Sequence, residues 1–429
     1  MVSVIYSGLM TAPTLTEART EPLGRPIKPP TAKSGYMPTL DGWRAVAIFL
    51  VIFYHGNGAP FEQLGHVGQK IADLFKIYGL YGVYLFFPLS GFLITSRILE
   101  EFKARGELSL KGFYIRRASR ILPPAMTFLF ALALLGFAGI VPVTLKGWLS
   151  SALSISNYWR TSNWYNGHFW SLAMEEHFYL LWPTLLVIFG IRKGWRTALV
   201  LAVAVAAYRF LNYKFLFVRM DGPYAMKFME RTDFQADALL WGCVFAFVYA
   251  DPQGRQRLAA LGSTWVYLAL TAVMVFTFLY HPHNWMVRQA QLMLNRALIP
   301  AIMAIGVANA SSIPARILEL SPMRFIGRLS YSLYLWQQLF FCRPAEALQH
   351  VGPLQHIPWN LICALALAFA SYHLIERPFI RLGHRLAKPV TEGRSVTREW
   401  KGSLGGVGKP LRSIRPDDVP LETCGHVAV

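Results

Sequence analysis

Charged residues are scarce in this sequence, and acidic residues are the scarcest of them. Only 15% of the 429 residues are charged, whereas about a quarter are charged in an ordinary soluble protein. Hydrophobic residues make up 54%, and apolar windows of near-spanning length recur along most of the chain. The sequence therefore predicts an all-α, polytopic integral membrane protein. In such a protein the net charge of +19 marks cytoplasmic loops and is no signature of nucleic-acid binding.

Cysteine is also scarce, and its spacing excludes two kinds of site. The four cysteines form neither a CxxC pair nor a zinc-binding pattern, so we expect packing residues without a disulfide framework. On an expected outer loop, His281 and His283 lack a third ligand, so we expect no metal. The cysteines are Cys243, Cys342, Cys363 and Cys424.

Both ends of the chain lack the features of a folded or targeting segment. Residues 1–36 have no long apolar run followed by a small-residue cleavage site, which favours a flexible cytoplasmic tail over a signal peptide. Residues 385–429 are rich in glycine, proline and charge, and are too polar to bury a core. We therefore expect two flexible cytoplasmic tails around one transmembrane domain, residues 37–384.

About ten apolar segments are expected to cross the membrane as helices of one bundle. Lysine and arginine concentrate in the short loops that are cytoplasmic if the N-terminus is cytoplasmic. The sequence thus predicts a multi-pass protein of a bacterial inner membrane with both termini in the cytoplasm. The segments are centred near residues 48, 88, 132, 180, 203, 242, 271, 303, 335 and 367.

The first of these segments, residues 40–56, is bracketed by Arg44 and His55. At about 100° and 1.5 Å per residue, the two side chains share one helix face and lie roughly 16 Å apart along the axis. An ionisable residue inside a membrane costs several kcal/mol unless it is paired or hydrated, so such residues indicate function. The alternative is that Arg44 reaches the interface and His55 caps the outer end of the helix.

A basic stretch, FYIRRASRILPP, follows the second span. If it is helical, Arg120 shares a face with both Arg116 and Arg117. The planar donor groups of arginine bind phosphate in a bidentate manner, so this segment is a candidate phosphate site. Ordinary positive-inside anchoring of the membrane edge explains the same residues equally well.

Two adjacent carboxylates, Glu175 and Glu176, interrupt the apolar fourth span between His168 and His177. Adjacent helical residues point about 100° apart, so one can face the bundle centre while the other pairs with a cation. Two carboxylates at this depth are costly, and a purely structural role is therefore less favoured here than for the arginines.

Other segments add polar residues to apolar surroundings. Pro88 in the second span predicts a kink of the kind that often borders a cavity. Asp237 lies in the sixth span, and Tyr331 lies in the ninth. Near the end of the tenth span, Glu376 is expected to form an interfacial ion pair with Arg377.

Six of these segments together resemble the bacterial acyltransferase type three family, integral-membrane enzymes that O-acylate cell-surface and secreted molecules. They occur in the family's order between residues 40 and 380. The segments are LDGWRAVAIFLVIFYHG, GVYLFFPLSGFLIT, FYIRRASRILPP, HFWSLAMEEHFYLLWP, LSYSLYLWQQLF and SYHLIERPF.

The resemblance implies roles for several of these residues. Arg44 and His55 would form the arginine-x10-histidine signature, with His55 essential for acyl transfer. Arg117 and Arg120 would form the RxxR motif, and Glu175 would belong to the WSLxxE motif. The family uses a cytoplasmic acyl-CoA, most often acetyl-CoA, and an acceptor hydroxyl that is usually on a sugar.

The sequence departs from the family pattern at three positions. Tyr84 stands where an aspartate is usual, Gln337 stands where a histidine is common, and Gln235 stands where an arginine is frequent. These departures bear on acceptor positioning more than on the reaction class. The hydrolase-like domain fused to some members is absent from this sequence, so a second acylation partner would be a separate protein.

These observations combine into one hypothesis of a membrane O-acyltransferase. His55 acts as base or nucleophile, Glu175 orients it, and Glu176 is the reserve for that role. Acyl-CoA and a saccharide or lipid-linked saccharide are the expected partners, within the lipid bilayer. A proton-coupled transporter or flippase using Glu175, Asp237 and His55, or an inactive relative, are the alternatives. The expected phosphate ligands are Arg44, Arg116, Arg117 and Arg120, and the expected acceptor contacts are Trp170, Ser171, Asp237 and Tyr331.

Overall fold

The computed structural model describes residues 36–56, 65–159, 163–219, 228, 230–280, 284–341 and 352–387. Nearly all of the two expected tails lies outside the described residues, as do His281, His283, Cys342 and Cys424. The other two cysteines, Cys243 and Cys363, are free thiols.

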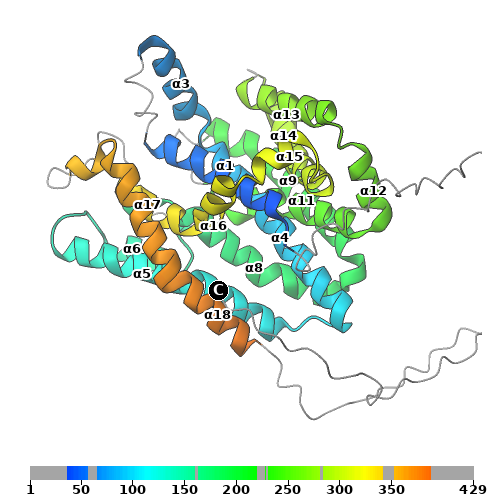
Figure 1. The fold of residues 1–429 in the computed structure, drawn as a ribbon, viewed down its shortest axis with the longest axis horizontal. Coiled ribbons are helices and arrows are strands. Elements are labelled where there is room, and N and C mark those ends of the chain that lie inside the picture. Colours follow the sequence, from blue (N-terminus) through cyan, green and yellow to red (C-terminus); the bar gives the residue numbers. More distant parts are fainter. Residues whose placement is uncertain are drawn as a thin grey trace, which may run out of the picture. The chain divides into compact units, whose positions relative to one another are not determined.

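All regular structure in these ranges is helical, which confirms the expected fold class (Figure 1). The segments near residues 48, 88, 132, 180, 203, 242, 271, 303, 335 and 367 each lie within a helix. The helices are α1 (Pro38–His55), α3 (Gly65–Tyr78), α4 (Tyr81–Arg105), α5 (Leu110–Phe137), α6 (Leu145–Ala152), α7 (Trp164–Gly167), α8 (Phe169–Phe189), η1 (Ile191–Lys193), α9 (Gly194–Arg219), α11 (Thr232–Ala250), α12 (Pro252–Ala260), α13 (Thr264–Leu279), α14 (Trp285–Ala308), α15 (Ile313–Leu318), α16 (Ser321–Trp336), η2 (Gln337–Leu339), η4 (Gly352–Gln355), α17 (Trp359–Ser371), η5 (Tyr372–Glu376) and α18 (Arg377–Leu386).

Six helical stretches in the described ranges are long and apolar enough to cross a membrane, so the expected count of about ten is not confirmed. The pair α12 and α13, bent by 87°, would be a seventh. The expected spans in α1, α11 and α16 are missing from this set. Charged residues interrupt α1 and α11, and α16 has 16 residues. The six stretches are Tyr81–Arg105, Leu110–Phe137, Trp164–Phe189, Ile191–Asn212, Met286–Ala308 and Trp359–Leu386.

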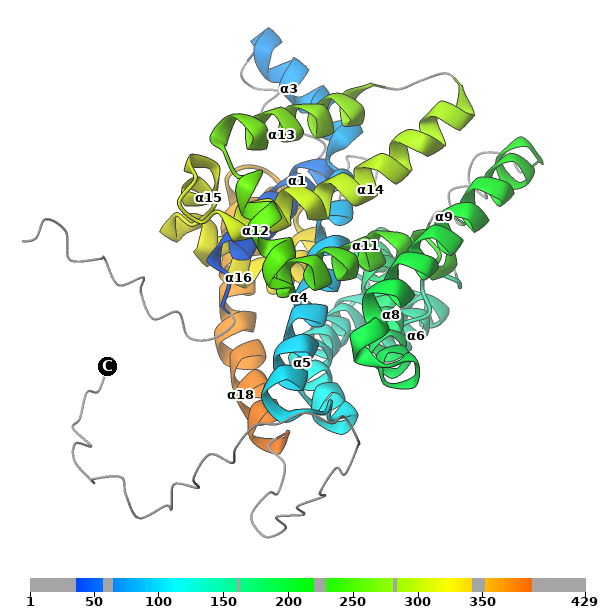
Figure 2. The same ribbon diagram turned by 90° about the vertical axis from the view of Figure 1, so that its right-hand side faces the viewer.

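The centre of the bundle is the close packing of α4 against α11. A Cβ atom at Gly91 would lie 1.9 Å from the carbonyl oxygen of Leu239, and one at Gly242 would lie 2.2 Å from that of Pro88. Both glycines therefore allow the two backbones to approach to a distance that side chains would prevent. On the flanks, α13 and α14 lie side by side (Figure 2).

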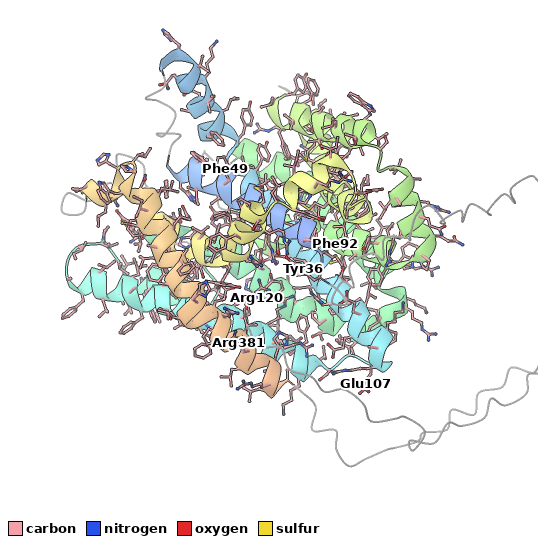
Figure 3. The ribbon with its side chains drawn as sticks, in the orientation of Figure 1. Tyr36, Phe49, Phe92, Glu107, Arg120 and Arg381 are labelled. Carbon is pink, nitrogen blue, oxygen red and sulfur yellow. The ribbon has the colours of Figure 1, made fainter. Side chains whose placement is uncertain are left out.

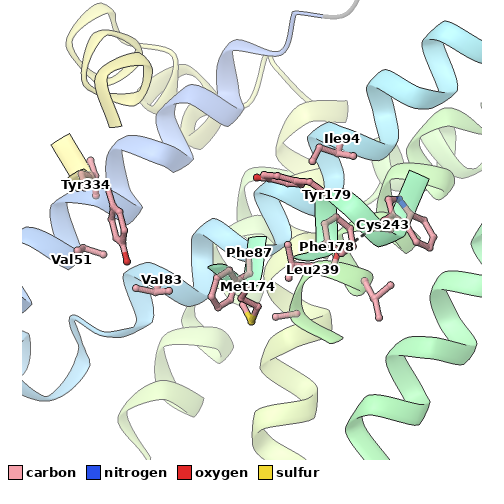
Figure 4. Packing of buried hydrophobic residues seen from close by; sticks show 14 of the residues in the cluster. Val51, Val83, Phe87, Ile94, Met174, Phe178, Tyr179, Leu239, Cys243 and Tyr334 are labelled. Carbon is pink, nitrogen blue, oxygen red and sulfur yellow. Dashed lines mark hydrogen bonds between the residues drawn. The ribbon is translucent and has the colours of Figure 1, made fainter. Parts of the chain in front are cut away.

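The largest apolar core joins α1, α4, α8, α11, α16 and α17. Phe87 of α4 and Met174 of α8, both fully buried, lie next to each other in it (Figure 4). Helix α1 packs against α4 on one side and α16 on the other. This arrangement carries Arg44 and His55 into the bundle interior instead of towards lipid.

A buried ion cluster connects α9, α11 and α14. Asp237 accepts hydrogen bonds from Arg209 at 2.8 and 2.9 Å, and both side chains are 0% exposed. Arg296 also pairs with Asp237, and its second terminal nitrogen donates to Gln235. One carboxylate thus serves two guanidinium groups, and the cluster depends on it because charges in a dry interior need partners.

We expect Asp237→Asn to lower the free energy of unfolding by about 3–5 kcal/mol, because two buried arginines lose their counter-charge. Thermal unfolding of the purified protein in detergent measures this effect. Asp233→Asn is the matched control, since its ion pair with Arg231 is one-third exposed and such pairs contribute about 0–1 kcal/mol. Equal unfolding temperatures for the two variants would contradict the prediction.

Candidate active site

A small cavity lies between α1, α4, α5, α8 and α16, with a volume of about 80 Å³. A buried water needs roughly 10–15 Å³ of such space, so the cavity holds only a few waters or one small chemical group. Five helices from distant parts of the sequence supply its charged and hydroxyl-bearing wall. These residues are Arg44, Ser90, Arg117, Arg120, Ser171, Glu175, Glu176, Tyr179, Ser330, Tyr331 and Tyr334.

Three of the predicted phosphate ligands converge on this cavity. Arg44 projects from α1 and lies 3.4 Å from Asp41, one turn earlier. Arg117 and Arg120 project from the same turn of α5, and the guanidinium of Arg117 lies 5.2 Å from the ring centre of Tyr179. Figure 3 labels Arg120 on α5, the helix against which α18 packs. Three guanidinium groups around one small cavity suit an anionic ligand.

The carboxylate of Glu175 faces the arginines and is held by two hydroxyl groups. Ser90 of α4 donates to its Oε1 at 3.1 Å, and Tyr179, one turn later on α8, donates to its Oε2 at 2.5 Å. Tyr179 also lies 3.2 Å from the Ser90 oxygen, so the three side chains form a closed polar group. These contacts fix the orientation of the carboxylate within the cavity wall.

The neighbouring Glu176 also lines the cavity, but its surroundings differ. Its Oε1 atom is buried without a hydrogen-bond partner among the described residues. Tyr331 of α16 lies within electrostatic range of it, and the hydroxyl of Tyr331 donates to the carbonyl of Ile121 at 2.9 Å. An unpaired buried carboxyl oxygen is costly, so this oxygen is available to a ligand that enters the cavity.

Two hydroxyl groups close the end of the cavity that is nearest His168. The oxygens of Ser171 and Tyr334 lie 2.5 Å apart. Both hydroxyls also lie within hydrogen-bond distance of the His168 carbonyl, at 3.0 and 3.3 Å. The His168 ring is 2% exposed and packs edge-on against Tyr334. This contact forms an end wall between α8 and α16.

His55 is not among the described residues that line the cavity. Its Nδ1 atom is 3.0 Å from the Oε1 atom of Gln337, and its ring lies edge-on to Trp164 at 5.4 Å. Both oxygens of Glu175 are engaged by Ser90 and Tyr179. In the structure, Gln337 contacts His55, whereas the sequence analysis expected Glu175 to make this contact.

Three other predicted site residues lie outside the cavity lining of the described chain. Arg116 points about 100° away from Arg117 on α5 and pairs at 2.5 Å with Glu101 at the end of α4. Trp170 packs against Phe87 in the apolar core, with ring centres 6.0 Å apart. Asp237 belongs to the buried ion cluster described above.

The surroundings of Glu376 differ from the interfacial ion pair with Arg377 that the sequence predicts. It is 1% exposed, accepts a hydrogen bond from Ser332 at 2.9 Å, and interacts electrostatically with Arg120. No ion pair with Arg377 is found in the described residues, because adjacent helical side chains point about 100° apart. Glu376 ends the π-helical turn η5, a local irregularity that is frequent at functional sites.

Tyr179, Ser90 and Tyr334 were not singled out as site residues from the sequence. Tyr179 follows Glu175 by four residues, so helical spacing alone could have identified it. Ser90 lies among small residues of the kind that suit close helix packing, and Tyr334 lies within an aromatic segment without any distinguishing spacing. In the described part of the chain, no group of three or more His, Cys, Asp or Glu side chains is arranged to hold a metal.

Comparison with known proteins identifies a family that the chain matches. Residues 37–373 match the family described as an acyltransferase domain. No solved structure matches the chain.

Three curated relatives illustrate the match. Peptidoglycan O-acetyltransferase OatA of Listeria monocytogenes is 27% identical over 81% of this chain and 56% of its own length. "Putative peptidoglycan O-acetyltransferase YrhL" of Bacillus subtilis is 29% identical over 85% of this chain and 58% of its own length. A "Putative O-acetyltransferase" of Staphylococcus aureus is 28% identical over 82% of this chain and 58% of its own length. The chain spans a little over half the length of these relatives. Because the family match covers most of the chain, this chain belongs to that acyltransferase family.

Proposed function

We propose that this protein is a membrane O-acyltransferase that moves an acyl group, most simply acetyl, from cytoplasmic acyl-CoA to a glycan hydroxyl. The observation that carries the proposal is the cavity in which Arg44, Arg117 and Arg120 face Glu175. Membership of the acyltransferase family supports the reaction class. The relatives named as peptidoglycan O-acetyltransferases support a saccharide acceptor.

The three arginines are suited to the phosphate groups of acyl-CoA. Charge-assisted hydrogen bonds from guanidinium to phosphate are short and bidentate, and each contributes about 1.5–3 kcal/mol. A cavity of about 80 Å³ is too small for the whole donor, so the phosphates would bind at its arginine end while the pantetheine arm extends inwards. Arg116 is left to its ion pair with Glu101.

The acyl group must pass the end wall to reach His55. Arg44 and His55 lie on one face of α1, eleven positions apart and roughly 16 Å apart along the axis. Between them, Ser171 and Tyr334 are in contact at 2.5 Å. Donor binding would therefore separate these two hydroxyls and join the cavity to the side of the bundle that holds His55.

At His55 the chemistry balances without any further reactant. As a general base, His55 accepts the proton of the acceptor hydroxyl while the oxygen attacks the thioester carbon and the C–S bond breaks. The proton then passes to the departing CoA thiolate. If His55 acts as a nucleophile, it forms an acyl-imidazole, releases CoA and is regenerated when the acceptor hydroxyl attacks. Either order produces one ester and one free thiol.

The proposed setting is a bacterial inner membrane with both termini in the cytoplasm. The excess of positive residues in the corresponding loops supports this orientation. Besides the six long apolar stretches, α1, α11, α16 and the bent pair α12–α13 would complete about ten crossings. Several polar residues of these helices are buried in the bundle, among them Asp237 of α11 and Ser332 of α16, and the interior is where polar residues within a membrane are tolerated. The ion cluster at Asp237 would support the wall of the bundle without contacting the acceptor.

We expect His55→Ala to lower acyl transfer by about 100-fold to 10⁴-fold, because it removes the proton-accepting group. The measurement supplies radiolabelled acetyl-CoA to proteoliposomes and follows the label into carbohydrate or lipid products. Acyl-CoA binding should be retained. If this variant kept most of the activity, the role of His55 would be contradicted. Movement of substrate across the membrane without incorporation of label would identify a transporter.

The double substitution of Arg117→Gln and Arg120→Gln should raise the KM for acetyl-CoA by about tenfold to 100-fold, because charged phosphate contacts are lost. Steady-state kinetics at varied acetyl-CoA concentration test this. Arg97→Gln is the control, since Arg97 is half-exposed and pairs with Glu100 away from the cavity. An unchanged KM in the double variant would place the phosphate site elsewhere.

A further inference from the structure

The contact between His55 and Gln337 joins the end of α1 to the turn that follows α16. Gln337 opens the short turn η2 and is 0% exposed. Its carbonyl oxygen accepts backbone hydrogen bonds from Phe340 and Phe341 at 3.0 and 2.8 Å. The backbone of Gln337 is therefore fixed, and its side chain reaches His55 from a rigid position.

The orientation of the Gln337 amide follows from its second contact. Its Nε2 atom donates towards the carbonyl of Tyr334, 3.5 Å away, so its Oε1 atom faces His55 Nδ1 at 3.0 Å. An amide oxygen only accepts hydrogen bonds, so the proton of the neutral imidazole lies on Nδ1. The lone pair of the ring is then on Nε2, the atom that can accept a proton or attack a carbonyl carbon.

We propose that Gln337 is the positioning residue of His55, selecting its reactive tautomer and its ring orientation. This inference rests on the proposed function, and it transfers to Gln337 the orienting role that the sequence suggested for Glu175. Trp164 lies edge-on to the ring at 5.4 Å and limits its rotation on another side. Helix α7, which begins at Trp164, and the turn η2, which begins at Gln337, contact each other and hold these two neighbours of the histidine.

A neutral amide in this position has a distinct chemical consequence. In other enzymes a carboxylate beside the histidine both orients the ring and stabilises the imidazolium form. Gln337 orients the ring but supplies no negative charge, so its contact with His55 is a hydrogen bond between neutral groups.

The test compares four forms of the full-length protein in proteoliposomes supplied with acetyl-CoA. Gln337→Met keeps the length of the side chain but removes the acceptor, and Gln337→Glu keeps the acceptor but adds a charge. Gln289→Met is the matched control, because the amide of this buried glutamine of α14 has no hydrogen-bond partner among the described residues, and Gln289 does not line the cavity. Turnover is measured from pH 5 to 9, with the unfolding temperature and acetyl-CoA binding measured alongside.

We expect Gln337→Met to lower turnover about tenfold to 100-fold, the range found when a partner that orients a histidine is removed. Gln337→Glu should retain turnover at high pH and shift the acidic limb of the profile upwards by about one pH unit or more. The control should keep the wild-type profile. Other titratable groups near His55 are unchanged in every variant, so they do not produce differences between the profiles. They include Tyr54 and His168.

Two results would overturn the assignment. The first is turnover in Gln337→Met equal to that of the control. The second is an unshifted acidic limb in Gln337→Glu, which would mean that the amide only packs there, even if Gln337→Met fails to fold. Failure of the proposed function itself is distinguishable, because the unsubstituted protein would then incorporate no label, or His55→Ala would retain acyl transfer, whatever the behaviour of Gln337.

Discussion

The interior of this bundle is organised by the cost of burying charge away from water. Every arginine described inside it lies near a carboxylate or an aromatic ring. Asp237 holds two guanidinium groups at the fully buried cluster, while Arg117 packs over Tyr179, whose hydroxyl in turn binds Glu175. The cluster at Asp237 is fully buried, and its one carboxylate pairs with both guanidinium groups. The cavity at Glu175 has three arginines and open space, so only the second arrangement can accept an anionic ligand.

The sequence predicted the residues whose cost in a membrane is highest. Arg44, Arg117 and Glu175 come from three helices and meet in one cavity, because an unpaired charge in an apolar helix must find a polar interior. The sequence could not separate cavity residues from those that satisfy one another elsewhere. Asp237 and Arg116 looked equivalent to the site residues, and their partners Arg209 and Glu101 became evident only from the three-dimensional arrangement. The expected count of about ten spans is not confirmed by length and composition for a related reason, since α1 and α11 are shielded by their neighbours and need not be uniformly apolar.

Two departures from the family pattern, noted separately in the sequence, are neighbours in the structure. Tyr84 lies against Gln235, and the guanidinium of Arg296 lies 5.9 Å from the ring centre of Tyr84. Relative to the pattern, one position lacks an acidic group and the other lacks a basic group, so together they leave the charge balance of this region unchanged. The pair therefore changes the shape and hydrogen bonding of the region more than its electrostatics. This accounts for how a departure at Tyr84 is compatible with a folded interior.

The contact between Ser171 and Tyr334 also has a consequence for the cell. A protein that hands a chemical group from one side of a membrane to the other must not provide a leak for protons or ions. The two hydroxyls meet beside the His168 carbonyl at the edge of the arginine cavity. Under the proposed function, a contact that stays closed until the thioester arrives would limit the leak of protons and ions through the resting protein.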